Sequence, residues 1–154
     1  MVQYWWVNQT DQHKIERNKE IVAARKSESG VTHWGRENVA KMNTGDRIIC
    51  YRSKIGIDSA AYVMKNCGIG PAPWDYKDDN GIAYIAKVRY FAVNPIPKND
   101  FINQMLGFAG RPKGPFLANG NIRYAYAMCL GKEEFGAISE IVKKSQPNVE
   151  WPSD

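Results

Sequence analysis

The segment 82–93 constrains the fold most, because it is the longest run in the chain with the alternation of a β-strand. The apolar side chains at every second position would share one face of this strand: Tyr84, Ala86, Val88 and Tyr90. Lys87 and Arg89 would point to the opposite face. We expect Asn94–Pro97, with its two prolines, to end the strand.

Shorter strands, short helices and loops are expected elsewhere in the chain. The β-rich and apolar segments predict further strands at residues 2–7, 47–51, 57–64 and 122–130. Residues 11–17 would form a turn or short helix, 20–24 a short apolar patch, 100–106 a short helix, and 68–73, with two glycines and two prolines, a loop. The clearest helix is 132–144, whose apolar stripe contains Phe135, Ile138, Ile141 and Val142.

This order of elements does not alternate strand, helix, strand. It therefore predicts an α+β fold, with a curved sheet or small β-barrel of about five or six strands and short inserted helices, rather than a doubly wound sheet. The length of 154 residues suits a single domain, which we place at residues 1–145, followed by a C-terminal tail at 146–154.

Composition narrows the possible partners. No apolar run is long enough for a transmembrane helix, and no signal peptide is visible, so we expect no membrane partner. Cys50, Cys67 and Cys129 are odd in number and widely spaced, which indicates a reducing, cytoplasmic location and neither a metal site nor a cofactor. The net charge of +5 permits a nucleic-acid partner without requiring one.

The segment 31–51 contains the most suggestive arrangement of residues. Trp34 and Gly35 come just before a short amphipathic helix, in which Val39 and Met42 would share one face. Gly45 can take a positive φ and stop this helix before the strand at 47–51. A flat aromatic beside the free N–H groups of a helix start suits a planar ligand, although an ordinary core position for Trp34 remains the alternative.

Several motifs together resemble the EVE domain family over nearly the whole chain. They are Tyr4–Gln9 (YWWVNQ), Trp34–Gly35, Gly45–Ile48, Pro95–Pro97, Gly114–Phe116 and Glu133–Phe135. EVE domains belong to the PUA-like group, as do YTH domains, which read methylated adenine in RNA. The resemblance implies a module that accepts one modified base into an aromatic pocket.

The resemblance also implies which residues form that pocket. Trp34 and Trp74 match the positions of two cage tryptophans in YTH domains, whereas the region of a third aromatic holds residues 77–80, with Tyr76 as a substitute. Polar residues at the end of the first strand would read the base edge: Asn8, Gln9 and Thr10. Gly35 and His33 would border the pocket beside Trp34. Trp5 and Trp6 would lie on opposite faces of the first strand, and a core position is expected for each, with one of them at the border of the pocket as the alternative.

Two loops offer basic residues for the nucleic-acid backbone. Arg25 and Lys26 lie in one, and Arg111 and Lys113 lie in a glycine-rich one. An ordinary solvated charge is the alternative for each of the four.

Catalytic residues are poorly supported by the sequence. His13 and His33 are the two histidines, and no motif places a nucleophile near either. Asp75, Asp78 and Asp79 lack the spacing of a calcium loop and suggest a solvated acidic loop. We therefore predict a monomeric, non-catalytic reader of a modified base in DNA or RNA. The alternatives are a PUA-like RNA-binding module indifferent to modification, or a small nucleic-acid-processing enzyme that uses His33 and the acidic loop.

Overall fold

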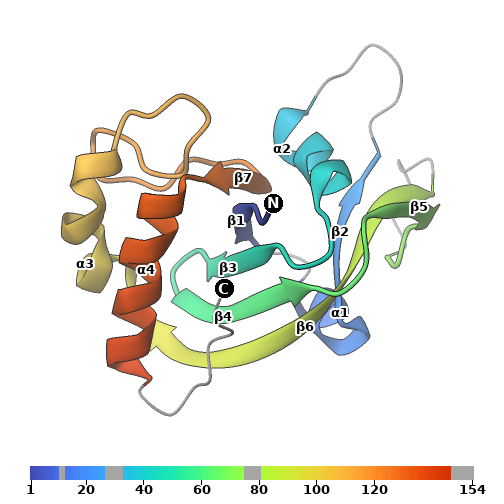
Figure 1. Ribbon diagram of the computed structural model, residues 1–154, viewed down its shortest axis with the longest axis horizontal. Coiled ribbons are helices and arrows are strands. Elements are labelled where there is room, and N and C mark those ends of the chain that lie inside the picture. Colours follow the sequence, from blue (N-terminus) through green and yellow to red (C-terminus); the bar gives the residue numbers. More distant parts are fainter. Residues whose placement is uncertain (11–12, 27–32, 75–80, 147–154) are drawn as a thin grey trace.

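The computed structural model describes residues 1–10, 13–26, 33–74 and 81–146, which form one curled sheet flanked by helices (Figure 1). The strands are β1 (Tyr4–Asn8), β2 (Ile21–Arg25), β3 (Arg47–Arg52), β4 (Gly56–Val63), β5 (Gly68–Pro71), β6 (Ile82–Ile96) and β7 (Ala127–Leu130). The helices are α1 (His13–Lys19), α2 (Trp34–Glu37), α3 (Lys98–Phe101), α4 (Lys132–Ser145) and two 3-10 helices, η1 (Asn38–Lys41) and η2 (Ile102–Phe108).

The sheet contains seven strands in the order β2-β6-β4-β3-β1-β7, and β5 also pairs with β6. β1 and β3 are parallel, and the other pairs of named strands are antiparallel. The sheet curls into a half-barrel, with α3 and α4 side by side on one side and α2 on another (Figure 1). This arrangement confirms the expected α+β class with a curved sheet.

β6 is the central element of this sheet. Its first half pairs with β2 and β5, and its second half pairs with β4. The predicted alternation is confirmed, because Tyr84, Ala86 and Val88 are buried while Lys87 and Arg89 are exposed. β6 extends three residues past Val93, the predicted last residue, and ends at Ile96, inside the segment 94–97 that was expected to end it. Pro95 lies where the register with β4 shifts, so its missing N–H is tolerated there.

Two further boundaries differ from the sequence prediction. Residues 68–71 form β5 rather than a loop, but this strand is short, lies beside β6 alone and is mostly exposed, which is where glycine and proline are tolerated in strands. The last strand begins at Ala127 rather than Ile122, which forms an isolated bridge with Phe116 instead.

β1 is buried on both faces of the sheet. Tyr4 and Trp6 enter one apolar cluster, which is shared with α3, η2 and α4. Trp5 and Val7 enter the other cluster, which includes residues of η1, β2 and β6. Trp5 and Trp6 are 2% and 0% exposed, so the prediction that both are core residues is confirmed.

Local features around the two cores also follow the sequence. Phe135, Ile138 and Val142 of α4 are buried, and the Phe135 ring stacks on Tyr4 with 4.4 Å between centroids. Val39 and Met42 are both fully buried, and Gly45 has the expected positive φ of 92°. No helix in the described ranges is long and apolar enough to cross a membrane.

The motif Gly45-Asp46 fixes the start of β1 against the turn before β3. Asp46 is fully buried, and its carboxylate accepts hydrogen bonds from the Trp5 indole N–H at 3.0 Å and from the backbone N–H groups of Gln3 and Asn43 at 3.0 and 2.9 Å. A buried carboxylate with three donors is well compensated.

Candidate nucleic-acid interface

Trp34 is the first residue of α2 rather than a residue before the helix. The carbonyl of the exposed His33 accepts the backbone N–H groups of Arg36 and Glu37, both at 3.0 Å, and so starts the helix. α2 is a single turn that continues as η1. The Trp34 side chain is half-buried, because it packs on the edge of the cluster that contains Trp6.

Three contacts hold α2 in place. Gly35 is buried, and a Cβ atom there would lie 2.9 Å from the Tyr126 backbone N and 3.1 Å from the Ala125 Cβ. The Asn38 amide donates to the Ala127 carbonyl at 3.0 Å, and the Glu37 carboxylate accepts from the Tyr84 hydroxyl at 2.9 Å. These contacts, which involve β7, the residues just before it and β6, set the position of Trp34. Gly35 contributes to them by letting α2 pack closely on residues 125 and 126.

We predict that Gly35→Ala displaces α2 and lowers the melting temperature, because the new methyl group meets backbone atoms that cannot move aside. A cost of about 1–3 kcal/mol is typical of such overpacking. Thermal unfolding measures it, with Gly136→Ala as the matched control, since a Cβ at that helical position meets nothing within 4 Å. Equal melting temperatures for wild type and Gly35→Ala would contradict this packing.

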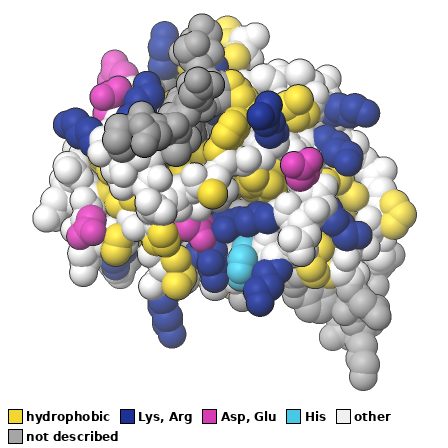
Figure 2. All heavy atoms as spheres, turned by 90° about the horizontal axis from the view of Figure 1, so that it is seen from below, with side chains coloured by type: hydrophobic (Ala, Val, Ile, Leu, Met, Phe, Trp, Pro, Cys, Tyr) yellow, Lys and Arg dark blue, Asp and Glu magenta, His cyan; other side chains and the backbone are white. Residues whose placement is uncertain are grey.

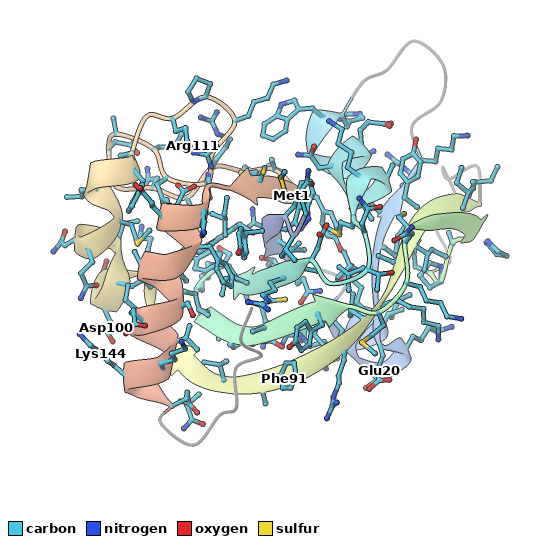
Figure 3. The ribbon with its side chains drawn as sticks, in the orientation of Figure 1. Met1, Glu20, Phe91, Asp100, Arg111 and Lys144 are labelled. Atoms are coloured by element: carbon cyan, nitrogen blue, oxygen red, sulfur yellow. The ribbon has the colours of Figure 1, made fainter. Side chains whose placement is uncertain are left out.

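Lys113 lies over the ring of Trp34, with its Nζ atom 5.7 Å from the indole centroid. The residue sits in the loop 109–126, which Figure 3 shows above α4 with Arg111 labelled. Arg111 Nη2 donates to the Cys129 carbonyl at 2.5 Å and to the buried Glu134 carboxylate at 2.6 Å. Within the described structure, Lys113 meets the candidate pocket wall directly, whereas Arg111 has two intramolecular partners that hold the loop.

Both the oxygen and the nitrogen of the Asn8 side chain are hydrogen-bonded within the fold. Its side-chain oxygen accepts the Trp6 indole N–H at 3.0 Å, and its amide donates to the carbonyls of Arg123 and Ala125 at 3.2 and 2.5 Å. The residue therefore ties β1 to the loop 109–126. Reading a base edge remains a prediction, and it would require Asn8 to exchange one of these partners.

Gln9 belongs to a buried polar network. It is 1% exposed, its amide donates to the Tyr90 hydroxyl at 2.8 Å, and its oxygen accepts two hydrogen bonds from Arg17 at 3.2 Å. Arg17 also pairs with Asp58 at 2.7 Å, and Arg52 shares that carboxylate at 3.1 Å. Thr10 is exposed, and its hydroxyl accepts the Ser53 N–H at 3.0 Å.

The buried carboxyl of Glu16 lies next to this network. Its Oε1 atom accepts the Tyr126 hydroxyl and the Ala23 backbone N–H, whereas Oε2 has no hydrogen-bond partner among the described residues. Burial raises the pKa of Glu16 from 4.5 to about 7, although the hydrogen bonds from Tyr126 and Ala23 and the charge of Arg17 act in the opposite direction. Glu16 is therefore partly protonated near neutral pH.

We predict that ionisation of Glu16 destabilises the fold as pH rises. Because the pKa is higher in the folded state, the folded chain holds more protons between pH 4.5 and about 7, and stability falls as pH rises through this window. The melting temperature of wild type should fall from pH 5 to pH 8 relative to Glu16→Gln, at roughly 2–4 °C for each kcal/mol. Burial lowers the pKa of His13, which has the opposite effect in both proteins and cancels in the comparison. Parallel pH profiles would show that Glu16 does not titrate in this range.

The second candidate wall, Trp74, follows β5 and is half-buried. Arg25 ends β2, and the backbone N–H of Lys26 donates to the Ile82 carbonyl at 3.0 Å, so both lie beside the start of β6. β5 ends at the same place, because Pro71 pairs with Ile82. Tyr76 and the acidic residues Asp75, Asp78 and Asp79 lie outside the described residues. Within the described ranges, no group of His, Cys, Asp and Glu could hold a metal ion.

A groove of about 500 Å³ lies between α3, η2 and α4, near the labelled Asp100 and Lys144 in Figure 3. Ile96 and Ile141 contribute apolar surface, and no aromatic side chain lines this groove. It therefore lacks the flat surface that base stacking requires.

Sequence reasoning missed the residues that fix the candidate site. Glu16 and Asp58 were not singled out, because charged residues in short helices and strands usually face water, and Tyr126 was not, because it lies in the loop before β7. The available signal was the Glu16-Arg17 pair next to an apolar strand, which is ambiguous without knowledge of what packs against it.

Comparison with solved structures shows what fold this chain shares. Human THYN1 protein in complex with 5-methylcytosine-containing DNA aligns over 92% of this chain and 98% of its own, with 13% identity and a TM-score of 0.59. A hypothetical protein from Leishmania major aligns over 95% and 98%, with 15% identity and a TM-score of 0.58. The Mmi1 YTH domain in complex with RNA aligns over 93% and 79%, with 10% identity and a TM-score of 0.57.

These likenesses confirm the expected PUA-like fold that EVE-type and YTH domains share. No family model matches the sequence. No curated protein matches it either. The identities of 10–15% show the fold alone.

Proposed function

We propose that this protein is a non-catalytic reader that holds one modified base of a nucleic acid against Trp34. The observation that carries the proposal is a half-buried tryptophan held on a fixed helix beside a basic loop. The neighbours in structure include a protein bound to methylcytosine DNA and a YTH domain bound to RNA, so this fold is known to support such complexes.

The energetics explain why aromatic walls are needed. Extruding a base from its stack costs a few kcal/mol. Stacking on one aromatic side chain returns roughly 1–3 kcal/mol, and a methyl group on the base adds about 0.8 kcal/mol when it is buried. One wall alone is therefore marginal, and a second wall or edge hydrogen bonds must contribute.

We propose Trp74 as that second wall. The side chain of Glu37 in α2 contacts Tyr84 of β6, and Tyr84 pairs with Ile69 of β5. α2 and β5 thus flank the same part of β6. Trp74 follows β5 by three residues, while the Ala72 N–H donates to the Gly81 carbonyl at 2.9 Å and keeps this segment beside the start of β6. This proximity supports a shared pocket.

Backbone phosphates are proposed to lie along Lys113, Arg25 and Lys26, with Arg111 as a further candidate. Charge alone does not single out this region. Figure 2 shows that Lys and Arg side chains are dispersed over the face below β4 and β6 as well. The proposal therefore depends on the proximity of Lys113 to an aromatic ring rather than on overall charge.

A PUA-like RNA-binding module indifferent to modification is the second candidate. The structurally similar YTH domain in complex with RNA favours RNA as the partner class. It does not indicate which base this chain would bind.

We predict that Trp34→Ala weakens binding of the modified base by about 5- to 160-fold, through the loss of roughly 1–3 kcal/mol of stacking, while the fold survives. A half-buried pocket wall leaves little cavity when truncated, whereas a core tryptophan would cost about 3–5 kcal/mol. Two measurements are paired: thermal unfolding, and titration with 5-methyl-2′-deoxycytidine, with N6-methyladenosine and with short strands that contain each base.

Trp6→Ala is the matched control, because Trp6 is fully buried and its loss should lower the melting temperature clearly. A comparable drop in melting temperature for Trp34→Ala would show that Trp34 is a core residue. Unchanged affinity in a stable Trp34→Ala variant would place the ligand elsewhere.

We also predict that binding to an oligonucleotide weakens as salt rises. Each phosphate contact releases counterions, so log K should fall against log salt with a slope of about −0.7 per contact for a single strand and −0.9 for a duplex. Titrations at low and moderate salt measure this slope. An affinity that stays constant over this range would exclude phosphate contacts as a major contribution.

A further inference from the structure

The contact between Lys113 and Trp34 lies at the protein surface. Lys113 is exposed, Trp34 is half-buried, and 5.7 Å between Nζ and the indole centroid is within the range of a cation–π interaction. The ammonium group therefore covers part of the ring surface on which a base could stack.

The backbone around Lys113 is unusual for a lysine. The Gly114 N–H donates to the Arg111 carbonyl at 3.1 Å, which closes a β-turn with Pro112 second and Lys113 third. Lys113 has a φ of 57°, and a positive φ at the third position of such a turn favours glycine. Glycine would suit this backbone better, but Glu20 and Lys54 also have a positive φ, so the position of the ammonium over Trp34, rather than φ, distinguishes Lys113.

The turn is held firmly while the lysine side chain is not. Arg111 is bound to the Cys129 carbonyl and to Glu134, and Arg123 Nε donates to the Gly114 carbonyl at 2.8 Å. A Cβ atom on Gly114 would lie 3.0 Å from the Arg111 guanidinium, so the turn packs closely on that anchor. The Lys113 ammonium can move away from Trp34 without disturbing these contacts.

We propose that Lys113 is a displaceable cover on Trp34, which makes the site select a base within a strand over the free nucleoside. This inference rests on the proposed function. A base that stacks on the covered surface displaces the ammonium group. An uncharged nucleoside provides no new partner for the displaced group. A strand offers a neighbouring phosphate to which the displaced Nζ moves.

The size of the effect follows from the strength of the contact. An exposed cation–π contact corresponds to a factor of about two to five in affinity, which a free nucleoside loses. Base stacking on an aromatic ring is stronger, so displacement remains favourable. The phosphate contact adds about one unit to the number of counterions released by a strand.

The test uses Lys113→Asn, because asparagine tolerates a positive φ and removes the charge. Lys54→Asn is the matched control, since Lys54 is also an exposed lysine with a positive φ, of 70°, in the turn between β3 and β4. Lys113→Arg retains the cation. The probes are 5-methyl-2′-deoxycytidine and N6-methyladenosine, each as the free nucleoside and in the centre of a short single strand.

We expect Lys113→Asn to bind the nucleoside about two- to fivefold more tightly and the strand more weakly, with a salt slope lower in magnitude by about 0.7. Lys54→Asn should leave nucleoside affinity unchanged, and Lys113→Arg should behave like wild type. The NMR signal of the Trp34 indole N–H, assigned through Trp34→Phe, should shift in Lys113→Asn and not in Lys54→Asn.

The distinguishing result is that Lys113→Asn changes the two affinities in opposite directions: the affinity for the free nucleoside rises and the affinity for the strand falls. If Lys113→Asn weakens the strand and leaves the nucleoside unchanged, Lys113 is an ordinary phosphate contact and the cover is wrong, while the proposed function stands. An unshifted Trp34 indole signal in ligand-free Lys113→Asn would also show that Lys113 does not cover Trp34. If wild type binds neither nucleoside nor strand, the proposed function fails and the selection inferred from it fails as well.

Discussion

The burial of β1 on both faces is the constraint on which the rest of the structure depends. Four consecutive large side chains alternate between two apolar clusters, so the sheet must be covered on one face by α4 and must curl around the other. Asp46 fixes the start of this strand through the Trp5 indole. Asn8 fixes its end to the loop before β7. Because α2 packs against that same region, the burial of β1 also determines where Trp34 lies.

The candidate residues therefore divide by the contacts they make. Asn8, Gln9 and Arg111 are engaged with buried or backbone partners, and they hold the elements around the site. Trp34 and Lys113 meet at the surface, where a ligand has access to them. Such a division is physically reasonable, because a polar group that has satisfied partners must lose them before it can bind a base. In the function that we propose, the intramolecular contacts would hold the reading surface in place, and the exposed Lys113 ammonium would move when a base binds.

The sequence predicted what depends on local patterns. The alternation of β6, the apolar stripe of α4 and the positive φ of Gly45 all follow from residue spacing or residue type, and each is observed. The strand β5 was missed because its two glycines and its proline signal a loop, while its pairing with β6 is a contact between distant segments. The burial of Glu16 was missed for the same reason, since only the folded chain brings Tyr126 over it. The pairing of Lys113 with Trp34 likewise joins residues far apart in sequence.

The central claim is that the site recognises a modification on one base, and the most direct measurement is an affinity ratio. Two strands of the same sequence, one with and one without a methyl group on the central base, are titrated against wild type across a panel of modified bases. Burial of a methyl group predicts a preference of at least about fourfold for one member of the panel, from about 0.8 kcal/mol. Equal affinity for modified and plain strands across the panel would contradict a reader and favour an RNA-binding module that ignores modification.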